Sequence, residues 1–396
     1  VGGTPGSIAR AIAFTLADII TSGSGEVRLT GDATNNPNTT NTAWGMQPND
    51  AGVITENGAI TLNMTGGAAT LNSRGLALDG QSLELLSETG TITIRDSEPA
   101  GLTGDYSGMY LRPGTTDAIT FGANGVEVAT SSSDIVVEAD KITFATHATR
   151  FNTNGTVTIA PVGTSFGNDL DNSLIDLSGS PTGFTLGKAG NTRKITVDTN
   201  TTVAGPITIY SDNLFIDAVL TATNDRISLI GAAPSNIQGT LETLADADIT
   251  ANELLVRNFN HAYLGTKAGS SVGTVSVNTV ASDGGDRFLL ENDKELTIGS
   301  VGGVDGITAT SYVSVATQTG DLNVNQAVTT TSNTFATPII LNAGQSADIS
   351  GAAPAVGTDT NGNIVINSDA GNNGSVSMAS GGRAKLYTGS IANSTG

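Results

Sequence analysis

The sequence predicts an all-β protein whose chain winds into a parallel, right-handed β-solenoid with about three short strands per coil. Three observations support this fold. Short alternating triplets recur along the chain, turn-forming residues separate them, and aromatic residues make up only 4% of the 396 residues. Together, 57 Thr, 34 Ser, 33 Asn and 50 Gly account for about 44% of the chain. Threonine favours strands, whereas glycine, asparagine and serine favour turns, so we expect many short strands joined by turns.

Each triplet consists of an apolar residue, a polar or small residue and a second apolar residue, as in Ile60-Thr61-Leu62. In a strand, this pattern places two side chains on one face and one on the other. Similar triplets occur at residues 83–85, 92–94, 119–121, 126–128, 135–137, 142–144, 157–159, 175–177, 184–186, 195–197, 207–209, 214–216, 227–229, 254–256, 275–277, 296–298, 313–315, 322–324, 364–366 and 376–378. Strands this short cannot form stable isolated hairpins, so we expect them to pair between stacked coils.

Three consecutive steps between triplets add up to about 20 to 30 residues, which suits a coil of about 22 residues. We therefore expect residues 51–396 to form the solenoid and residues 1–50 to form an N-terminal cap or irregular segment. The pattern is interrupted at residues 31–50, 99–117, 161–173 and 231–248, which predicts loop excursions there. A string of β-sandwich domains is the competing fold, but one Trp, six Tyr and ten Phe suit a narrow solenoid core better.

The longest apolar run, residues 8–20, contains Arg10 and Asp18 and is too short to span a bilayer. Its apolar residues at helical spacing predict a short helix, or else buried strands, at one end of the fold; a membrane or partner helix is the alternative. No stretch of the sequence is long and apolar enough for a transmembrane segment. Because the chain begins at Val1, we expect that a leader was removed or that a longer protein contains this sequence.

Three segments carry a resemblance to a known family: residues 205–223, the preceding Phe184-Thr185-Leu186-Gly187, and residues 361–371. In style of repeat they resemble the filamentous-haemagglutinin-like adhesins and related giant exoproteins of bacteria. The Asn-Pro-Asn-Gly element of that family's secretion domain is absent, since Asn36-Pro37-Asn38 is followed by Thr39. The resemblance implies secretion, display on the bacterial cell surface, and adhesion or fibre formation.

Composition excludes several classes of function. With no cysteine, the chain has no disulfide framework, no zinc ribbon and no thiol nucleophile. A formal net charge of −20 with 17 Lys and Arg argues against nucleic-acid binding, because no cationic surface is available to neutralise phosphates. His147 and His261, the two histidines, are 114 residues apart and belong to no recognisable triad, so we assign no catalytic and no cofactor-binding residue.

An enzyme remains the alternative, because parallel β-helices also carry sites that cleave polysaccharides. Such sites need carboxylates about 5–9 Å apart on one face. The candidate pairs are Asp283 with Asp286, Asp169 with Asp171, and Asp246 with Asp248. Of these pairs, Asp283 and Asp286 are the one that a basic residue, Arg287, directly follows, so the segment from Asp283 to Arg287 is the cluster to test. Each pair also lies beside turn residues, where aspartate commonly accepts backbone N–H groups.

Calcium is the ion that this acidic, Asp- and Asn-rich surface is suited to bind, weakly and through loop oxygens. The closest approach to a calcium-binding nonapeptide is Gly302-Gly303-Val304-Asp305-Gly306, but its spacing does not fit. No metal ligand is therefore assigned to a residue.

From these observations we expect a non-catalytic extracellular structural or adhesive protein that forms a rod. Other copies of the same chain are the expected partner, in a fibre or surface layer, because exposed strand edges recruit further strands. Ladders of threonine, asparagine and serine are also suited to contact with glycans. A carbohydrate-active β-helix enzyme or tailspike-like depolymerase is the alternative function.

Overall fold

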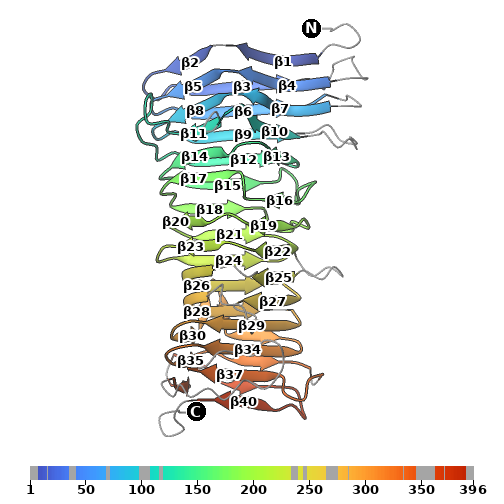
Figure 1. The fold of residues 1–396 in the computed structure, drawn as a ribbon, viewed down its shortest axis with the longest axis vertical. Coiled ribbons are helices and arrows are strands. Elements are labelled where there is room, and N and C mark those ends of the chain that lie inside the picture. The colour runs from blue at the N-terminus through green and yellow to red at the C-terminus, as the bar shows by residue number, and fades with distance from the viewer. Residues whose placement is uncertain are drawn as a thin grey trace. The chain divides into compact units, whose positions relative to one another are not determined.

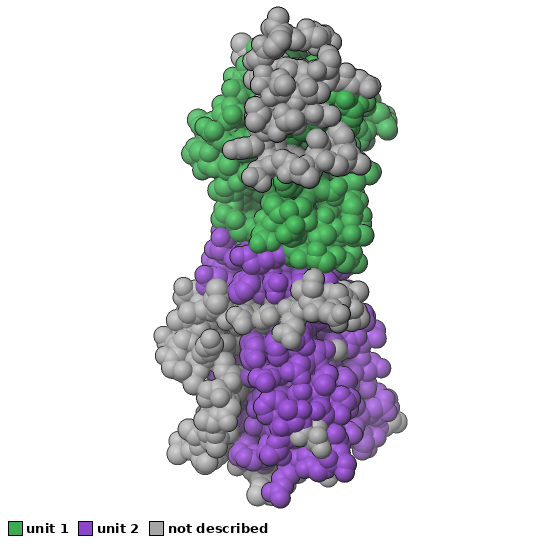
Figure 2. All heavy atoms as spheres, turned by 90° about the vertical axis from the view of Figure 1, so that its right-hand side faces the viewer, with its two compact units in different colours: residues 1–193 green, residues 194–396 purple. Residues whose placement is uncertain are grey.

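The structure is a computed structural model and describes residues 8–15, 17–34, 42–67, 72–97, 108–115, 119–232, 240–243, 248–264, 275–283, 285–332, 334–344, 362–369 and 371–388. These residues form β-strands and turns, and none of them lies in a helix. The chain divides into two compact units, residues 1–193 and 194–396, which Figure 2 shows in green and purple. The predicted all-β, parallel solenoid architecture is confirmed.

In the first unit, strands β1 to β12, β14 and β15 each pair in parallel with the strand three positions later in the chain, so three rows of strands form (Figure 1). The first row contains β1 (Ile8–Thr15), β4 (Thr42–Asn49), β7 (Asn72–Gln81), β10 (Met109–Pro113) and β13 (Ile142–Phe144). The second contains β2 (Asp18–Thr21), β5 (Ala51–Thr55), β8 (Leu83–Ser87), β11 (Ile119–Gly122), β14 (Thr149–Thr153) and β17 (Ile175–Gly179). The third contains β3 (Val27–Asp32), β6 (Ile60–Thr65), β9 (Ile92–Ser97), β12 (Ile135–Ala139), β15 (Thr156–Ala160) and β18 (Gly183–Leu186). The short strand β16 spans Leu170–Asp171.

The second unit has the same plan, but two long strands each serve two rows. One row contains β19 (Ile195–Val197), β22 (Asn213–Ile216), β25 (Thr240–Thr243), β27 (His261–Leu264), β29 (Arg287–Asn292), β34 (Tyr312–Thr317), β37 (Ile339–Ala343) and β40 (Ala384–Tyr387). A second row begins with β20 (Thr201–Val203) and β23 (Val219–Ala222), and a third row begins with β21 (Ile207–Tyr210) and β24 (Arg226–Ile230). Both rows join in the long strands β26 (Asp248–Arg257) and β28 (Val275–Asp283). After β28 there are again two rows. One contains β30 (Leu296–Ile298), β35 (Leu322–Val324) and β38 (Ile364–Ile366), and the other contains β33 (Ile307–Ala309), β36 (Val328–Thr330) and β39 (Val376–Ser377).

Alternation within the triplets builds the core. Ile60, Ile92 and Ile135 are paired one above another in β6, β9 and β12, and all three are fully buried. The residues that follow them, Thr61, Thr93 and Val136, form the matching outward row and are only half-buried. Each apolar residue is therefore covered by its counterpart in the next coil, which is why a single coil could not bury its own core.

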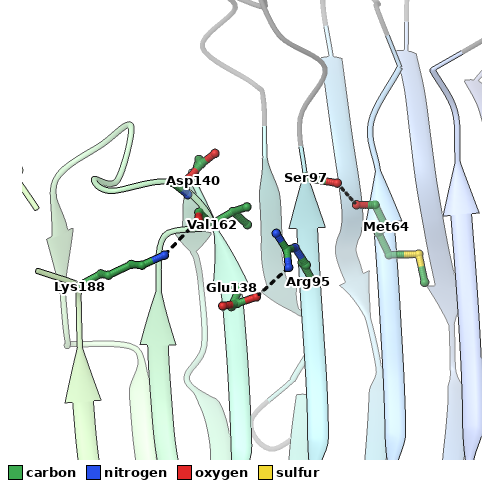
Figure 3. A network of polar contacts seen from close by, with 8 residues as sticks. Met64, Arg95, Ser97, Glu138, Asp140, Val162 and Lys188 are labelled. Atoms are coloured by element: carbon green, nitrogen blue, oxygen red, sulfur yellow. Dashed lines mark hydrogen bonds and ion pairs between the residues drawn. The ribbon is translucent and has the colours of Figure 1, made fainter. Parts of the chain in front are cut away.

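Polar contacts link neighbouring coils on the outside of the third row (Figure 3). Arg95 of β9 forms an ion pair with Glu138 of β12, with 3.5 Å between Nη1 and Oε2. Lys188 donates from Nζ to the carbonyl oxygen of Val162 at 3.2 Å. These side chains are partly exposed, so each contact contributes little to stability, about 0–1 kcal/mol.

Buried hydroxyl groups and glycines build one corner of the first unit. Thr55 and Ser87, paired in β5 and β8, both donate from their hydroxyl groups to the Gly58 carbonyl oxygen, at 2.6 and 3.2 Å. The Ser87 hydroxyl also accepts from the Gly90 N–H at 2.9 Å. A Cβ on Gly58 would overlap the Gly25 carbonyl oxygen, and one on Gly90 would overlap that of Gly58. This corner, formed by Gly25, Gly58, Gly90, Thr55 and Ser87, therefore has room only for glycine at positions 58 and 90.

Several expected details differ from the structure. Of the two predictions for the apolar run at residues 8–20, the strands are confirmed as β1 and β2 and the helix is wrong, but Ile12 and Ile19 are only half-buried and Ile20 is exposed. The predicted excursion over 31–50 includes β4, and that over 99–117 includes β10. Coils are longer than expected in the first unit, where Val27 pairs with Ile60 and Ile60 with Ile92, 33 and 32 residues apart. In the second unit, Ile195 pairs with Leu214 only 19 residues later. Coil length varies because the turns between strands have different lengths.

Candidate functional site

The cluster singled out in the sequence, Asp283 to Arg287, lies at a corner of the second unit. Asp283 ends β28 and Arg287 begins β29, while Gly284 between them lies outside the described residues. One coil earlier, Arg257 ends β26 opposite Asp283, and His261 begins β27 opposite Arg287. One coil later, Tyr312 begins β34 opposite Arg287. Parallel pairing thus brings together side chains that are about 25 residues apart in the sequence.

Asp283 forms a bidentate ion pair with Arg257. Arg257 donates from Nε to Asp283 Oδ1 at 3.0 Å, and its Nη2 lies 2.9 Å from Oδ2. Their side chains are 41% and 35% exposed, so water still reaches both groups. The planar guanidinium matches both oxygens of the carboxylate, which fixes the direction in which each group points.

Asp286 is engaged by two neighbours. Ser311, in the next coil, donates its hydroxyl hydrogen to Asp286 Oδ1. Arg287 forms an ion pair with the same carboxylate, with 3.5 Å between Nε and Oδ2. Each of the two candidate carboxylates is therefore paired with its own arginine, and they do not form a pair of free carboxylates.

Aromatic rings lie on the strands and turns next to Arg287. The Arg287 guanidinium carbon lies 4.8 Å from the centre of the Phe335 ring, and the Phe335 and Tyr312 ring centres are 5.5 Å apart at 52°. On the other side, His261 and Tyr263 stack with ring centres 6.1 Å apart. All four rings are partly exposed. We call this group, Arg257, His261, Tyr263, Asp283, Asp286, Arg287, Ser311, Tyr312 and Phe335, the aromatic corner.

Sequence reasoning missed five members of the aromatic corner: Arg257, Tyr263, Ser311, Tyr312 and Phe335. Their contacts depend on the exact lengths of the coils between residues 257 and 335, which the triplets do not determine. A usable signal was present, because four of the chain's rare tyrosines and phenylalanines lie within residues 263–335: Tyr263, Phe288, Tyr312 and Phe335.

The other carboxylate pairs have simpler surroundings. Asp169 and Asp171 flank buried Leu170 and are both exposed, as expected for outward positions of a strand. Asp171 accepts from the Ser173 N–H at 3.2 Å and from its hydroxyl group, which is a local turn contact. Asp246 lies outside the described residues, as does the side chain of Asp248.

The segment Gly302 to Gly306 forms a hairpin, with Val301 of β31 (Ser300–Val301) antiparallel to Val304 of β32 (Val304–Asp305). Gly302 and Gly303 both have positive φ, at 57° and 80°, which is the conformation that tight hairpin turns require. The Asp305 carboxylate accepts from the Ser300 hydroxyl at 2.6 Å. The glycine pair thus serves a turn, and Val301 and Val304 pack on Leu255 and Ala281.

The first unit contains a second group of arginine and aromatic side chains. Arg10, Trp44 and Arg74 are paired in successive strands, and each guanidinium carbon lies 5.8 Å from the centre of the Trp44 ring. The Arg74 guanidinium also covers the Tyr110 ring at 3.8 Å. Arg74 and Trp44 are almost fully buried, so this stack serves as packing between coils.

His147, the other histidine, lies in the turn before β14 and belongs to the first unit, whereas His261 belongs to the second. Within the described ranges, no three carboxylate or histidine side chains are placed so that they could hold a metal ion. The same part of the chain contains no helix of the length and apolar character needed to cross a membrane.

Comparison with known proteins gives no assignment: no family model matches the sequence, and no curated protein or solved structure matches it either. The fold therefore identifies a parallel β-solenoid architecture, and the aromatic corner is the best-defined candidate site.

Proposed function

We propose that this is a non-catalytic, extracellular structural or adhesive protein that assembles with further copies of itself by adding strands at the edges of its sheets. The observation that supports this most directly is the state of the first and last strands that the structure describes. In the described part of the chain, β1, β2 and β3 pair on one side only, with β4, β5 and β6. Their other edges carry backbone N–H and C=O groups that a further strand can pair with.

Apolar side chains in the first coil are less covered than those one coil further in. Met46 and Val53 are buried, whereas their counterparts Ile12 and Ile19 are only half-buried. Ile20, which is paired with Ile54, is 70% exposed. A strand added beside β1 and β2 would remove this apolar surface from water, which is favourable by about 25 cal/mol per Å².

A corresponding edge exists in the second unit. Leu290, Val315 and Leu341 form a buried inward row that continues to Leu386 of β40. Leu386 is 46% exposed, and among the described strands β40 pairs only with β37. Because the two edges come from different parts of the chain, contacts between them would be heterologous, and such contacts extend into filaments or rings rather than close into dimers.

Two lysine substitutions test the assembly. Ile20→Lys and Leu386→Lys place a charge on an unpaired edge, while Val126→Lys alters a valine that is 81% exposed in a turn and serves as the matched control. We expect wild-type protein and V126K to form filaments or sheets in negative-stain images and fast-sedimenting species at high concentration. We expect I20K and L386K to remain monomeric with unchanged circular dichroism. Monodisperse wild-type monomers, with and without calcium, would contradict the proposal.

The enzymatic alternative is tested separately. We expect no release of reducing ends when the protein is incubated with neutral and acidic polysaccharides, because both carboxylates of the aromatic corner are paired with arginine. If reducing ends were released, and if Asp283→Asn or Asp286→Asn abolished that release, the protein would instead be a polysaccharide-cleaving enzyme.

Localisation at the bacterial surface is part of the proposal and is supported by the resemblance and the absence of cysteine.

A further inference from the structure

We propose that the aromatic corner binds an uncharged polysaccharide chain built of pyranose sugars. This inference rests on the proposed adhesive function and assigns it a site and a class of ligand. The side chains that would make the contacts are the row His261, Arg287 and Tyr312, one from each of three successive coils, together with Phe335.

The chemistry of the corner suits sugars because it combines ring faces with fixed polar groups. A pyranose ring has a C–H face, which packs against aromatic rings, and an edge of hydroxyl groups, which need planar donors and acceptors. Tyr312 and Phe335 supply the rings. The bidentate pair Arg257–Asp283 supplies donors and acceptors whose directions are already set, and Arg287 lies 3.5 Å from Asp286 as a looser ion pair. A ligand therefore pays little entropy for ordering these side chains.

The spacing of the coils suits a chain rather than a single sugar. Adjacent parallel strands lie about 4.8 Å apart, so His261, Arg287 and Tyr312 offer contacts at a regular interval close to the length of one pyranose unit. A polysaccharide that runs across the strands can therefore place successive sugars on successive coils.

Charge decides between neutral and acidic polysaccharides. Two arginines and two aspartates cancel within the corner, while the whole chain has a net charge of −20. The surrounding negative potential opposes the approach of an acidic polymer. The ligand class is accordingly a neutral glycan, and binding should be nearly independent of salt concentration.

Affinity electrophoresis in native gels tests this site with defined polymers: dextran, galactomannan and hydroxyethylcellulose, with polygalacturonate as the acidic comparison. We expect at least one neutral polymer to retard the wild-type protein and polygalacturonate not to. The Phe335→Ala and Arg287→Lys variants should each need at least a tenfold higher polymer concentration to reach the same retardation. Tyr110→Ala, which removes an arginine-stacked tyrosine from the first unit, should leave it unchanged.

Thermal melting of every variant distinguishes a binding role from a packing role. Arg287→Lys keeps the charge, so we expect its melting temperature to stay near that of the wild type while retardation is lost. Retardation by no neutral polymer, retardation by polygalacturonate alone, or retention in both F335A and R287K would overturn the inference. Its failure is separable from that of the proposed function, because filament formation is scored by imaging without any polymer. If the protein forms filaments but no neutral polymer retards it, the proposed binding site is refuted while the proposed assembly stands.

Discussion

At the scale of single residues, small groups decide how closely coils approach. Gly58 and Gly90 leave no room for a Cβ against the carbonyl oxygen of the coil before, and the Thr55 and Ser87 hydroxyl groups bind the carbonyl group that this approach brings near. The sequence pattern is a hydroxyl residue followed by glycine three residues later, as in Thr55-Glu56-Asn57-Gly58 and Ser87-Glu88-Thr89-Gly90. Each of these hydroxyl groups gives a hydrogen-bond partner to a backbone group of the turn that would otherwise be buried and unpaired.

Replacing a corner glycine tests this account. We expect Gly58→Ala to lower the free energy of unfolding by about 2–3 kcal/mol, because the added Cβ forces the backbone of two coils apart. Ser87→Ala should cost about 1–2 kcal/mol through the lost hydrogen bonds. Val126→Ala, at an exposed turn position, should change stability by less than about 0.5 kcal/mol. Urea unfolding measures all three. A Gly58→Ala protein as stable as V126A would refute the close approach.

Asp212 provides a pH-dependent test at the same scale. This side chain is buried, with its residue only 3% exposed, and burial raises its pKa above the ordinary aspartate value of 3.8. The native state therefore holds the proton more tightly than the unfolded chain, so Asp212 lowers stability progressively as pH rises from about 3.8 through the raised native pKa. We expect Asp212→Asn to stabilise the protein at pH 7 and to have little effect near pH 3.5. Urea midpoints at the two pH values measure this; exposed Asp217→Asn is the control.

At the scale of strands, alternation separates core from surface within a single triplet. Ile92 is fully buried between Ile60 and Ile135, while Thr93 points outward and remains half-exposed. Nineteen of the 21 triplets named above lie wholly in strands, and residues 376–378 do so in part, but Val126-Glu127-Val128 does not. There, the Asn124 side chain accepts from the N–H groups of Val126 and Glu127 at 3.0 Å, which closes a turn instead. A local side-chain acceptor thus competes with strand pairing.

Adjacent residues of one triplet should therefore respond very differently to the same substitution. We expect Ile92→Ala to destabilise the protein by about 2–4 kcal/mol, since it opens a cavity between three coils. Thr93→Ala should cost less than about 1 kcal/mol, mainly through strand propensity. Denaturant midpoints compare the two variants directly. Equal effects would mean that the two side chains do not lie on opposite faces of β9.

At the scale of the whole molecule, composition and triplets were sufficient to predict the solenoid and its three strands per coil. They could not predict coil length, because turns and insertions between strands carry no periodic signal; paired residues are 33 apart at Val27 and Ile60 but 19 apart at Ile195 and Leu214. Because coil length could not be predicted, the contacts of the aromatic corner could not be predicted either. Arg287 could be singled out beside Asp286, but its contact with Phe335 depends on the register of two further coils.

The net charge of −20 gives a prediction for the intact protein. We expect millimolar calcium to raise the melting temperature by a few degrees, because a divalent ion reduces repulsion among exposed carboxylates. Sodium chloride at the same ionic strength is the control for general screening. Calorimetry with calcium, with sodium chloride and with chelator measures the effect. Equal midpoints in calcium and chelator would exclude even weak calcium binding.

The glycine corner has a consequence for how such a chain changes length over generations. Gly58 packs against the carbonyl group of Gly25, and Gly90 packs in the same way against that of Gly58, so the Gly25 and Gly58 corners present the same surface to the next coil. Deleting one full repeat, from Val27 to Ala59, would bring Gly25 and Glu26 directly before Ile60 and leave matching surfaces on either side of the cut. Losing or gaining only half a repeat would place glycine where a side chain must pack. Duplication and loss of whole coils is therefore the tolerated route of change in this part of the molecule.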